Sequence, residues 1–368
     1  MPIRTSNAVT RPADVVVVGR GIAGLCAALA AADHGLQVTV ADTARPGAAS
    51  RVAAGLLAPS LDGLAPSVRA IAIEARDAYP DFLAHLRMRA DRPVALDRNG
   101  ILELASSASD LAHLMARAGH SAQALGQHEL AQLEPALAGH AGALLHPHDG
   151  AVDNVALMDA LDLAVASNRR IHRCPAQIVS FDFLPARPVA VTAAGLRLDG
   201  ASVLLATGAW ASRIPGLPRA LPVRPVRGEV LCLDTLPIRH VTYGAGGYLV
   251  PRGSSLLIGA TSDESGFDSH PSDAGRASLL AIATRAVPSL ASANIVEHRA
   301  GLRPMTPDAM PILGRDPDVP GLVYACGFSR NGILLAPWAA AQLARLLAGG
   351  DTGHALAPFR PERFESNN

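Results

Sequence analysis

The hydrophobic pattern at the start of the chain predicts a strand, a glycine turn, a helix and a second strand. Residues 15–18 are four consecutive valines, the continuous β-branched run of a strand that is buried on both faces. Residues 22–34 are rich in alanine and leucine and predict a helix, with Gly35 at its end. Residues 37–41 predict the second strand. Strand, helix and strand in this order predict a parallel sheet of the Rossmann type.

The middle of the chain has a different pattern. Residues 66–149 contain helical stretches, such as 68–89 and 109–119, that are broken by proline and glycine turns, and a further helix is expected at 155–167 with Asn154 as its N-cap. Short β-type runs follow between residues 229 and 259, the last two joined by a hairpin turn. An apolar helix at 332–348, interrupted at Pro337, closes the chain. We therefore predict an α/β fold, with a Rossmann-like domain and a second, α+β domain built on an antiparallel sheet.

Length and composition narrow the possible functions. A chain of 368 residues predicts two domains. The net charge is zero, which argues against nucleic acid or an anionic membrane as the main partner. The four cysteines lie far apart and the histidines show no metal-ligand spacing, so we expect neither disulfides nor a metal site. Residues 1–12 lack a signal-peptide pattern and no apolar run is long enough to span a membrane, so we expect a cytoplasmic protein.

The first glycine turn is a candidate nucleotide-binding motif. Residues 19–24 read GRGIAG, which fits the GxGxxG spacing between a strand and a helix. Gly19 would allow the tight turn, Gly21 would let the backbone approach a pyrophosphate, and Gly24 would let helix and strand pack closely. Asp42 lies 18 residues after Gly24, where an acid accepts hydrogen bonds from a ribose. The alternative is a glycine turn with a purely structural use, and this unit alone does not distinguish FAD from NAD.

Two other segments favour a flavin. Residues 50–57 read SRVAAGLL, and small side chains of this kind suit a backbone that lies against a flat ring system. Gly327 and Gly332 flank a turn before the last helix, whose N-terminal dipole would stabilise negative charge on a reduced flavin.

With these segments the chain resembles the D-amino-acid oxidase and glycine oxidase family of FAD-dependent oxidoreductases, most closely bacterial glycine oxidases of the thiamine-thiazole pathway. The matching stretches follow the family's order along nearly the whole chain. They are AAGLL at 53–57, VRPVRGE at 223–229, YLVPR at 248–252, IGAT at 258–261, AGLRP at 300–304 and RNGILLAP at 330–337.

The resemblance implies roles for three side chains. Arg303 matches the arginine that holds the substrate carboxylate, Tyr248 matches a tyrosine that hydrogen-bonds the same group, and Arg330 matches an arginine at the edge of flavin and substrate. A guanidinium binds a carboxylate through two parallel hydrogen bonds, which agrees with the first role. The alternatives are a structural salt bridge for Arg303, an ordinary core position for Tyr248 and structural pairing for Arg330.

The implied reaction is oxidative deamination of glycine or of a small or N-substituted amino acid. A hydride passes from Cα to the flavin, the imine hydrolyses to a 2-oxo acid and an amine or ammonia, and dioxygen reoxidises the flavin with release of hydrogen peroxide. Sarcosine-oxidase relatives attach flavin to a cysteine before the position of Thr306; this chain has none there, so FAD is expected to be non-covalent. Gly246 stands where glycine oxidases often have a histidine, which predicts a more open entrance.

The motif and the resemblance together give the expected organisation. The FAD-binding domain comprises residues 1–80, 150–220 and 299–368, and the substrate-binding domain comprises residues 81–149 and 221–298. The expected partners are an amino-acid substrate and dioxygen, and a homo-oligomer is left open. The expected cofactor-binding residues are Gly19, Gly21, Ile22, Ala23, Gly24, Asp42, Thr43, Ser50, Arg51, Ala54, Gly55, Leu56, Ala176, Thr207, Gly208, Asn331, Gly332, Ile333 and Leu334.

Three other functions remain open from the sequence. One is a tRNA-modifying relative that oxidises a carboxymethylaminomethyl group on uridine, although such proteins usually carry a methyltransferase domain and a basic surface. A second is a dehydrogenase that passes electrons to a quinone or a partner subunit. The third is a non-catalytic FAD-binding subunit of an assembly.

Overall fold

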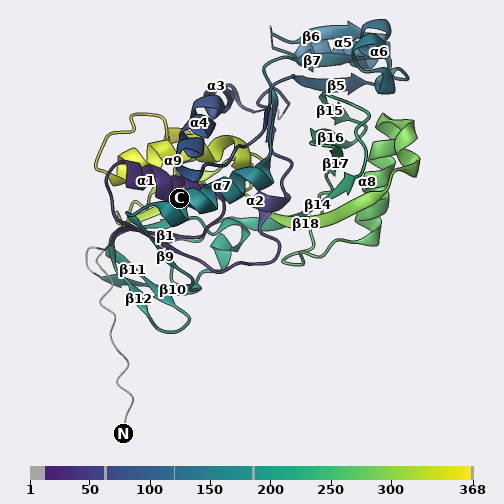
Figure 1. Cartoon of the computed structure of the whole chain (residues 1–368). Coiled ribbons are helices and arrows are strands. Elements are labelled where there is room, and N and C mark those ends of the chain that lie inside the picture. The colour runs from purple at the N-terminus through teal and green to yellow at the C-terminus, as the bar shows by residue number, and fades with distance from the viewer. Residues whose placement is uncertain (1–12, 62–63, 120, 185–186, 366–368) are drawn as a thin grey trace.

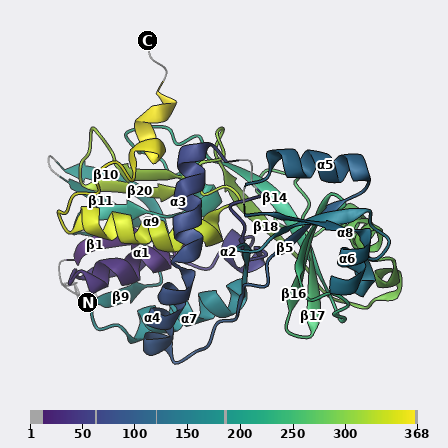
Figure 2. The same ribbon diagram turned by 90° about the horizontal axis from the view of Figure 1, so that it is seen from above.

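The computed structural model describes residues 13–61, 64–119, 121–184 and 187–365. Two lobes lie side by side, with the Rossmann-like sheet and its helices in one and a large antiparallel sheet in the other (Figures 1 and 2). The expectation that residues 1–12 hold no targeting segment lies outside the described ranges. Within those ranges, no helix combines the length and the apolar character that a membrane crossing requires.

The first lobe is built on a six-stranded sheet. Its strand order is β19-β20-β13-β1-β2-β9, parallel throughout except for β19, which pairs antiparallel with β20. Val15 and Val17 pack into the core on one face and Val16 and Val18 into the core on the other, which explains the unbroken run of valines. The bounds are β1 Ala13–Val18, β2 Val38–Ala41, β9 Ile171–Cys174, β13 Gly200–Leu205, β19 Ile312–Arg315 and β20 Leu322–Cys326.

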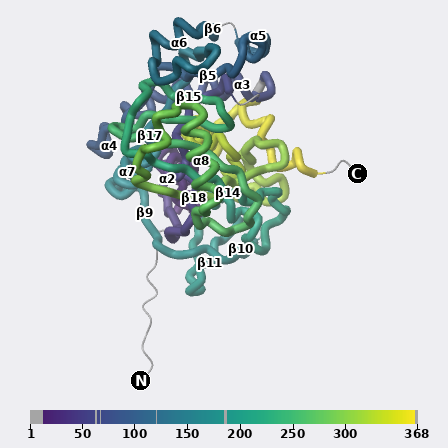
Figure 3. Tube along the Cα trace, turned by 90° about the vertical axis from the view of Figure 1, so that its right-hand side faces the viewer, coloured from purple at the N-terminus to yellow at the C-terminus, as the bar shows by residue number. Residues whose placement is uncertain are grey.

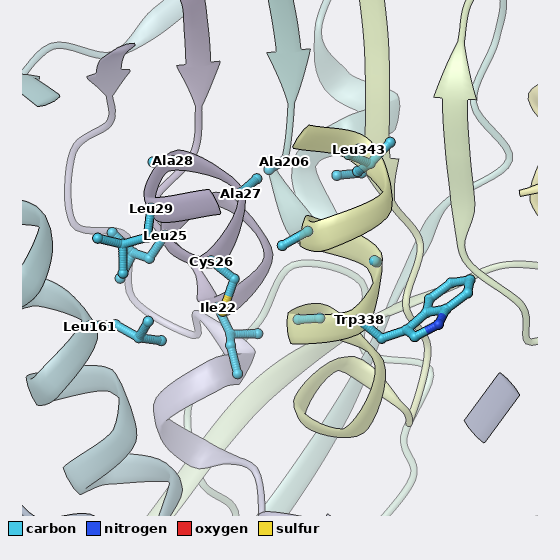
Figure 4. Close-up of a cluster of buried hydrophobic side chains, with 14 of the residues drawn as sticks. Ile22, Leu25, Cys26, Ala27, Ala28, Leu29, Leu161, Ala206, Trp338 and Leu343 are labelled. Carbon is cyan, nitrogen blue, oxygen red and sulfur yellow. The ribbon is translucent and has the colours of Figure 1, made fainter. Parts of the chain in front are cut away.

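Helices cover one face of this sheet and a small antiparallel sheet covers the other. Figure 4 shows the core between α1 (Ile22–Asp33), α7 (Asn154–Ser167) and α9 (Gly332–Leu347), where alanine and leucine side chains let the helices approach closely. The remaining elements of this lobe are α2 (Ala49–Val52), α3 (Pro66–Asp77), α4 (Tyr79–Ala90), β10 (Ile178–Leu184), β11 (Arg187–Thr192), β12 (Arg197–Leu198) and the 3₁₀ helices η2 (Gly208–Arg213), η4 (Ala357–Phe359) and η5 (Pro361–Phe364).

The second lobe is built on an eight-stranded sheet of order β18-β14-β17-β16-β15-β5-β7-β6. All pairs are antiparallel except β15 with β5. One face packs on α8, and the part with α5, β6 and α6 lies at the opposite end of the molecule from β10 and β11 (Figures 1 and 3). The bounds are β5 Ile101–Ala105, α5 Ala108–Arg117, β6 Gln123–Gly126, α6 Gln127–Leu133, η1 Pro135–Leu137, β7 Gly142–His146, β14 Arg224–Leu233, β15 Val241–Gly244, β16 Gly247–Arg252, β17 Ser255–Gly259, α8 Asp273–Ala286, η3 Pro288–Ser292 and β18 Ile295–Met305.

A three-stranded sheet of β3 (Leu56–Leu57), β8 (Gly150–Val152) and β4 (Leu96–Asp97) joins the two lobes. The predicted fold class, a Rossmann-like domain beside an α+β domain on an antiparallel sheet, is confirmed. The division into domains by residue number stays a prediction, and β18 runs across its boundary at 298/299 within the second-lobe sheet.

The helical stretches expected at 68–89 and 109–119 are present as α3, α4 and α5, but the strands β4 to β7 were missed in this segment, and three of them extend the large sheet. Two other local predictions were wrong. Asp153 rather than Asn154 caps α7, since its carboxylate accepts hydrogen bonds from the amides of Val155 and Ala156. The closing helix is not interrupted at Pro337.

The continuity of α9 through Pro337 has a structural reason. Proline lacks the N–H that would donate to the carbonyl four residues earlier, which is that of Ile333. The buried hydroxyl of Tyr79 donates a hydrogen bond to this carbonyl instead. The acceptor that proline leaves unpaired is therefore satisfied from another helix, and the start of α9 is tied to the helical layer.

Candidate cofactor and substrate site

A cavity of about 290 Å³ lies between the two lobes. A second hollow, beside Arg76 and Asp97, measures only about 10 Å³, so the first is the candidate site. The first lobe contributes the carboxyl ends of β1, β2, β13 and β20 and the starts of α1 and α9. The second lobe contributes β14, β15, β16 and the end of β18. Ligands of open parallel sheets bind at this carboxyl edge.

The glycine turn lies at the first-lobe end of the cavity. Gly19 has a φ of 112°, and a Cβ there would lie 2.3 Å from the carbonyl oxygen of Ala206 on the next strand. A Cβ on Gly24 would lie 1.9 Å from the carbonyl oxygen of Gly19, so only glycine allows α1 to pack this closely on the turn. The amide of Ile22 donates to the hydroxyl of Ser50, 3.0 Å away, which ties the start of α1 to α2.

Asp42 lies at the carboxyl end of β2, where the sequence places an acid for a ribose. Its two carboxylate oxygens accept hydrogen bonds from the amides of Arg20 (3.0 Å) and Thr43 (2.8 Å). Burial raises the pKa of this carboxyl group, although these two hydrogen bonds and the charges of Arg45 and Arg20 act to lower it. A buried, oriented carboxylate therefore faces the cavity.

Arg303 extends from β18 at the second-lobe end. Its Nη1 donates to the carbonyl of Thr261 at 2.9 Å and more weakly to that of Arg227 at 3.4 Å. No carboxylate oxygen of the described residues lies within 4.0 Å of this guanidinium, which argues against the structural salt bridge. Burial lowers the pKa of Arg303, and the charge of Arg330 lowers it further. An anion bound here would offset both effects.

Tyr248 on β16 also lines the cavity and lies opposite Gly259 of β17. Burial raises the pKa of its phenol, while the positive charges of Arg303 and Arg330 act to lower it. The neutral hydroxyl is therefore the stable form near neutral pH, and it is a hydrogen-bond donor beside the Arg303 guanidinium.

Arg330 comes from the turn between β20 and α9 and is exposed at the cavity. The preceding Ser329 has a φ of 52°, and its amide donates to the carbonyl of Pro304 at 3.0 Å. This bond joins the closing turn to the residue directly after Arg303. Residues 303 and 330 are thus brought to the same end of the cavity.

Most of the predicted site residues line the cavity, but five do not. Gly24 packs under the turn, Leu334 lies in the core of α9, and Ala176 follows β9. Thr43 only donates its amide to Asp42, and Arg51 points away into ion pairs with Asp159 and Asp162 of α7. The lining residues are Gly19, Gly21, Ile22, Ala23, Asp42, Ser50, Ala54, Gly55, Leu56, Thr207, Gly208, Tyr248, Arg303, Arg330, Asn331, Gly332 and Ile333.

Sequence reasoning missed Tyr243, which lines the cavity directly opposite Tyr248 in the β15–β16 hairpin. The signal was present in the segment 244–247, GAGG, which forms a tight turn. Ala245 (φ 54°) and Gly246 (φ 90°) both adopt positive φ, as a two-residue type I′ hairpin requires. A two-residue turn at 245–246 would have paired Tyr243 with Tyr248 from the sequence alone.

Trp210, Arg20 and Arg45 also line the cavity without having been predicted. Arg45 lies over the Trp210 ring, 5.4 Å from its centroid, and Arg20 forms an ion pair with Asp162 at 2.5 Å. Cys326 lines the cavity as well, and its thiol donates to the carbonyl of Leu205. Within the described ranges no group of His, Cys, Asp and Glu is placed to hold a metal ion.

Comparison with known proteins identifies the class. Residues 14–346 match the model of the DAO family, described as FAD dependent oxidoreductase. The chain therefore belongs to this family.

Individual relatives are more specific. The chain is 33% identical to the glycine oxidase of Geobacillus kaustophilus, over 94% of this chain and 96% of that protein. The crystal structure of glycine oxidase from the same organism matches with a TM-score of 0.91, over 96% of this chain and 99% of that chain. The bifunctional protein ThiO/ThiG of Synechocystis is 34% identical over 95% of this chain and 54% of its own length. The structure of iminodiacetate oxidase from Chelativorans matches with a TM-score of 0.87 at 26% identity, over 94% and 98% of the chains. The predicted family is confirmed, and with it FAD as the cofactor and an amino-acid oxidase as the class of enzyme.

Proposed function

We propose that this protein oxidises glycine or a small, N-substituted amino acid to a 2-oxo acid, an amine or ammonia, and hydrogen peroxide. The observation that carries the proposal is the Arg303 guanidinium. It lies in the cavity, is held by two backbone carbonyls, and has no carboxylate partner among the described residues. A buried cation with free donors in this position is a binding site for a carboxylate.

The residues around the other end of the cavity fit FAD. A backbone turn with glycine at 19 and 21 opens onto the start of α1, where amide groups and the helix dipole favour a diphosphate. The carboxylate of Asp42, which follows β2 at the cavity, would accept hydrogen bonds from the ribose. The hydroxyl of Thr207 lines the cavity and is buried without a hydrogen-bond partner within the described structure, so a cofactor atom would satisfy it.

When bound, FAD supplies the redox chemistry, taking the electrons of the amino acid and passing them to dioxygen. The protein supplies orientation. Arg303 would hold the carboxylate plane, Tyr248 would donate to a carboxylate oxygen, and Arg330 would contribute a second positive charge. No side-chain base is required if the amine binds in its neutral form.

The part of the cavity lining beside Tyr248 bears on how large a substrate the site accepts. Gly246 and Gly247 line the cavity there and carry no side chains. We therefore propose that sarcosine or an N-carboxymethyl amino acid is oxidised at least as efficiently as glycine. The likeness to an iminodiacetate oxidase supports an N-carboxymethyl substrate, and the likeness to glycine oxidases supports a role in the thiamine-thiazole pathway. We further propose a cytoplasmic enzyme without a nucleic-acid partner, free to form a homo-oligomer.

A peroxide-coupled screen of purified holoenzyme tests the function. Glycine, sarcosine, N-ethylglycine, iminodiacetate and D-alanine should be compared in steady state, with oxygen consumption measured in parallel. Oxidation of at least one of them with stoichiometric peroxide supports the proposal. Turnover with an artificial dye but not with oxygen would make the protein a dehydrogenase, and a clear preference for glycine would refute the open-entrance argument.

A further inference from the structure

Two side chains of the proposed carboxylate site lie flat on the sheet, each across a glycine. A Cβ on Gly228 of β14 would lie 2.3 Å from Cζ, Nη1 and Nη2 of Arg303. A Cβ on Gly259 of β17 would lie 2.2 Å from Cε2 and 2.5 Å from Oη of Tyr248. Carbon atoms in contact are about 3.5–4.0 Å apart, so neither position accepts even a methyl group while these side chains stay in place.

The strand order explains why both glycines are needed. The strands β18, β14, β17 and β16 are consecutive, with Arg303 on the first and Tyr248 on the last. Arg303 leans inward over β14 and reaches the carbonyl of Thr261 just beyond β17. Tyr248 leans inward from the other side over Gly259, its direct partner in the register. The guanidinium and the phenol thus approach each other over the two central strands.

We propose that Gly228 and Gly259 are positioning residues, which form a floor without side chains that sets the height of Arg303 and Tyr248 above the sheet. The role rests on the proposed function, because it assumes that Arg303 and Tyr248 hold the substrate carboxylate. A methyl group on this floor lifts the planar group above it by about 1.2–1.7 Å, the difference between the 2.3 Å approach at Gly228 and an ordinary contact of about 3.5–4.0 Å. A displacement of this size in a positioning group reduces the rate by about a hundredfold.

Alanine substitution tests the contact at positions that do not need a positive φ. Neither Gly228 nor Gly259 has a positive φ, so an L-residue can adopt both backbone conformations. Gly139 offers a matched control, because its φ is likewise not positive and nothing lies within 4 Å of the position of its Cβ. The variants Gly228→Ala, Gly259→Ala and Gly139→Ala therefore differ in what the new methyl group meets.

The three variants are compared with wild type as holoenzymes. Gly228→Ala and Gly259→Ala should keep FAD and a melting temperature near that of Gly139→Ala. Their KM for the best substrate and their Kd for acetate, read from the flavin absorbance, should rise by about ten- to a hundredfold. Gly139→Ala should match wild type in both constants. Unchanged constants in Gly228→Ala would overturn the inference.

A double-mutant cycle with Arg303→Lys identifies the route of the effect. Lysine has no planar group to rest on the glycine, so Gly228→Ala should change the acetate Kd by about twofold or less in the Arg303→Lys background. An equal fold-change in both backgrounds would show that Gly228 serves the fold and would overturn the inference. If Gly259→Ala fails to fold, Gly228→Ala and this cycle decide the question.

The wild-type measurement distinguishes a failure of this inference from a failure of the proposed function. If the wild-type enzyme oxidises amino acids and Gly228→Ala has unchanged constants, only the role of the glycines is refuted. A wild-type holoenzyme that neither oxidises an amino acid nor binds acetate refutes the proposed function and this role with it.

Discussion

Replacing Arg303 with leucine should nearly abolish amino-acid oxidation and leave FAD bound. The guanidinium makes its two described hydrogen bonds to carbonyl oxygens, those of Thr261 and Arg227. Because no described carboxylate pairs with it, the substitution strands no buried negative charge, and the fold should survive. The substrate, in contrast, would lose the cation that fixes its carboxylate.

The expected loss of folding stability is smaller than the expected loss of substrate binding. Losing a charged donor to the carbonyl of Thr261 costs about 1.5–3 kcal/mol of stability at most. Losing a buried, charge-assisted anchor for the substrate costs several kcal/mol, or about two to three orders of magnitude in kcat/KM. Arg303→Lys should recover little activity, because an ammonium cannot bind a carboxylate through two parallel bonds. Steady-state oxygen consumption, FAD content and melting temperature measure these effects.

Arg299 provides the matched control. It lies four residues earlier on β18, donates to the carbonyl of Arg51 at 3.0 Å and does not line the cavity. Arg299→Leu therefore removes the same charge from the same strand and should keep near-normal kcat/KM. Near-normal activity in Arg303→Leu would move the carboxylate anchor to Arg330. Loss of FAD or of folding in Arg303→Leu alone would instead support a structural role.

Three further outcomes are expected. Because the pKa of Asp42 is raised, its carboxylate takes up a proton at a higher pH than an ordinary aspartate does. The affinity for FAD should therefore begin to fall at a higher pH as the solution is acidified. In a fluorescence titration, Asp42→Asn should flatten this pH dependence. The raised pKa of Tyr248 keeps its phenol protonated beyond about pH 10. Tyr248→Phe should therefore lower kcat/KM by about five- to tenfold, and by the same factor at every pH near neutrality. A loss of activity confined to alkaline pH would contradict this. Denaturation should release the flavin to the supernatant in wild type and in Cys326→Ser alike, and flavin retained only by the wild-type precipitate would reveal attachment to Cys326.

Much of the first lobe could be predicted because its signals are local. Four valines followed by the 19–24 turn specify strand, turn and helix without reference to the rest of the chain. The segment 66–149 could not be predicted equally well, because its strands are short and become strands by pairing with distant partners. Residues 101–105 pair with the 241–244 strand, a contact that no local pattern contains. The hydroxyl that donates to the Ile333 carbonyl, and so lets α9 continue through Pro337, likewise comes from Tyr79, far away in sequence.

The residues of the candidate site likewise divide into those that local motifs predict and those whose contacts come from distant segments. Gly19, Asp42 and Arg303 belong to motifs and line the cavity as expected. Arg51 belongs to a motif too, but its guanidinium pairs with α7, which spacing along one segment cannot show. Gly228 lies in the matching stretch 223–229, but its proposed role depends on the Arg303 side chain, which crosses it from the neighbouring strand and which the stretch alone does not reveal.

The two ends of the chain depend on each other through the helices that follow the two motifs. α1 begins at the first glycine turn and α9 begins at the closing turn, and both starts line the cavity. Their side chains share one core, to which Ile22 and Cys26 of α1 and Leu343 of α9 contribute (Figure 4). The positive dipole ends of both helices therefore lie at the same cavity, where the amide of Ile22 already donates to Ser50. We propose that FAD binds only when both helices are packed, so that its binding stabilises the contact between segments about 300 residues apart by mass action and the first and last motifs function as one site.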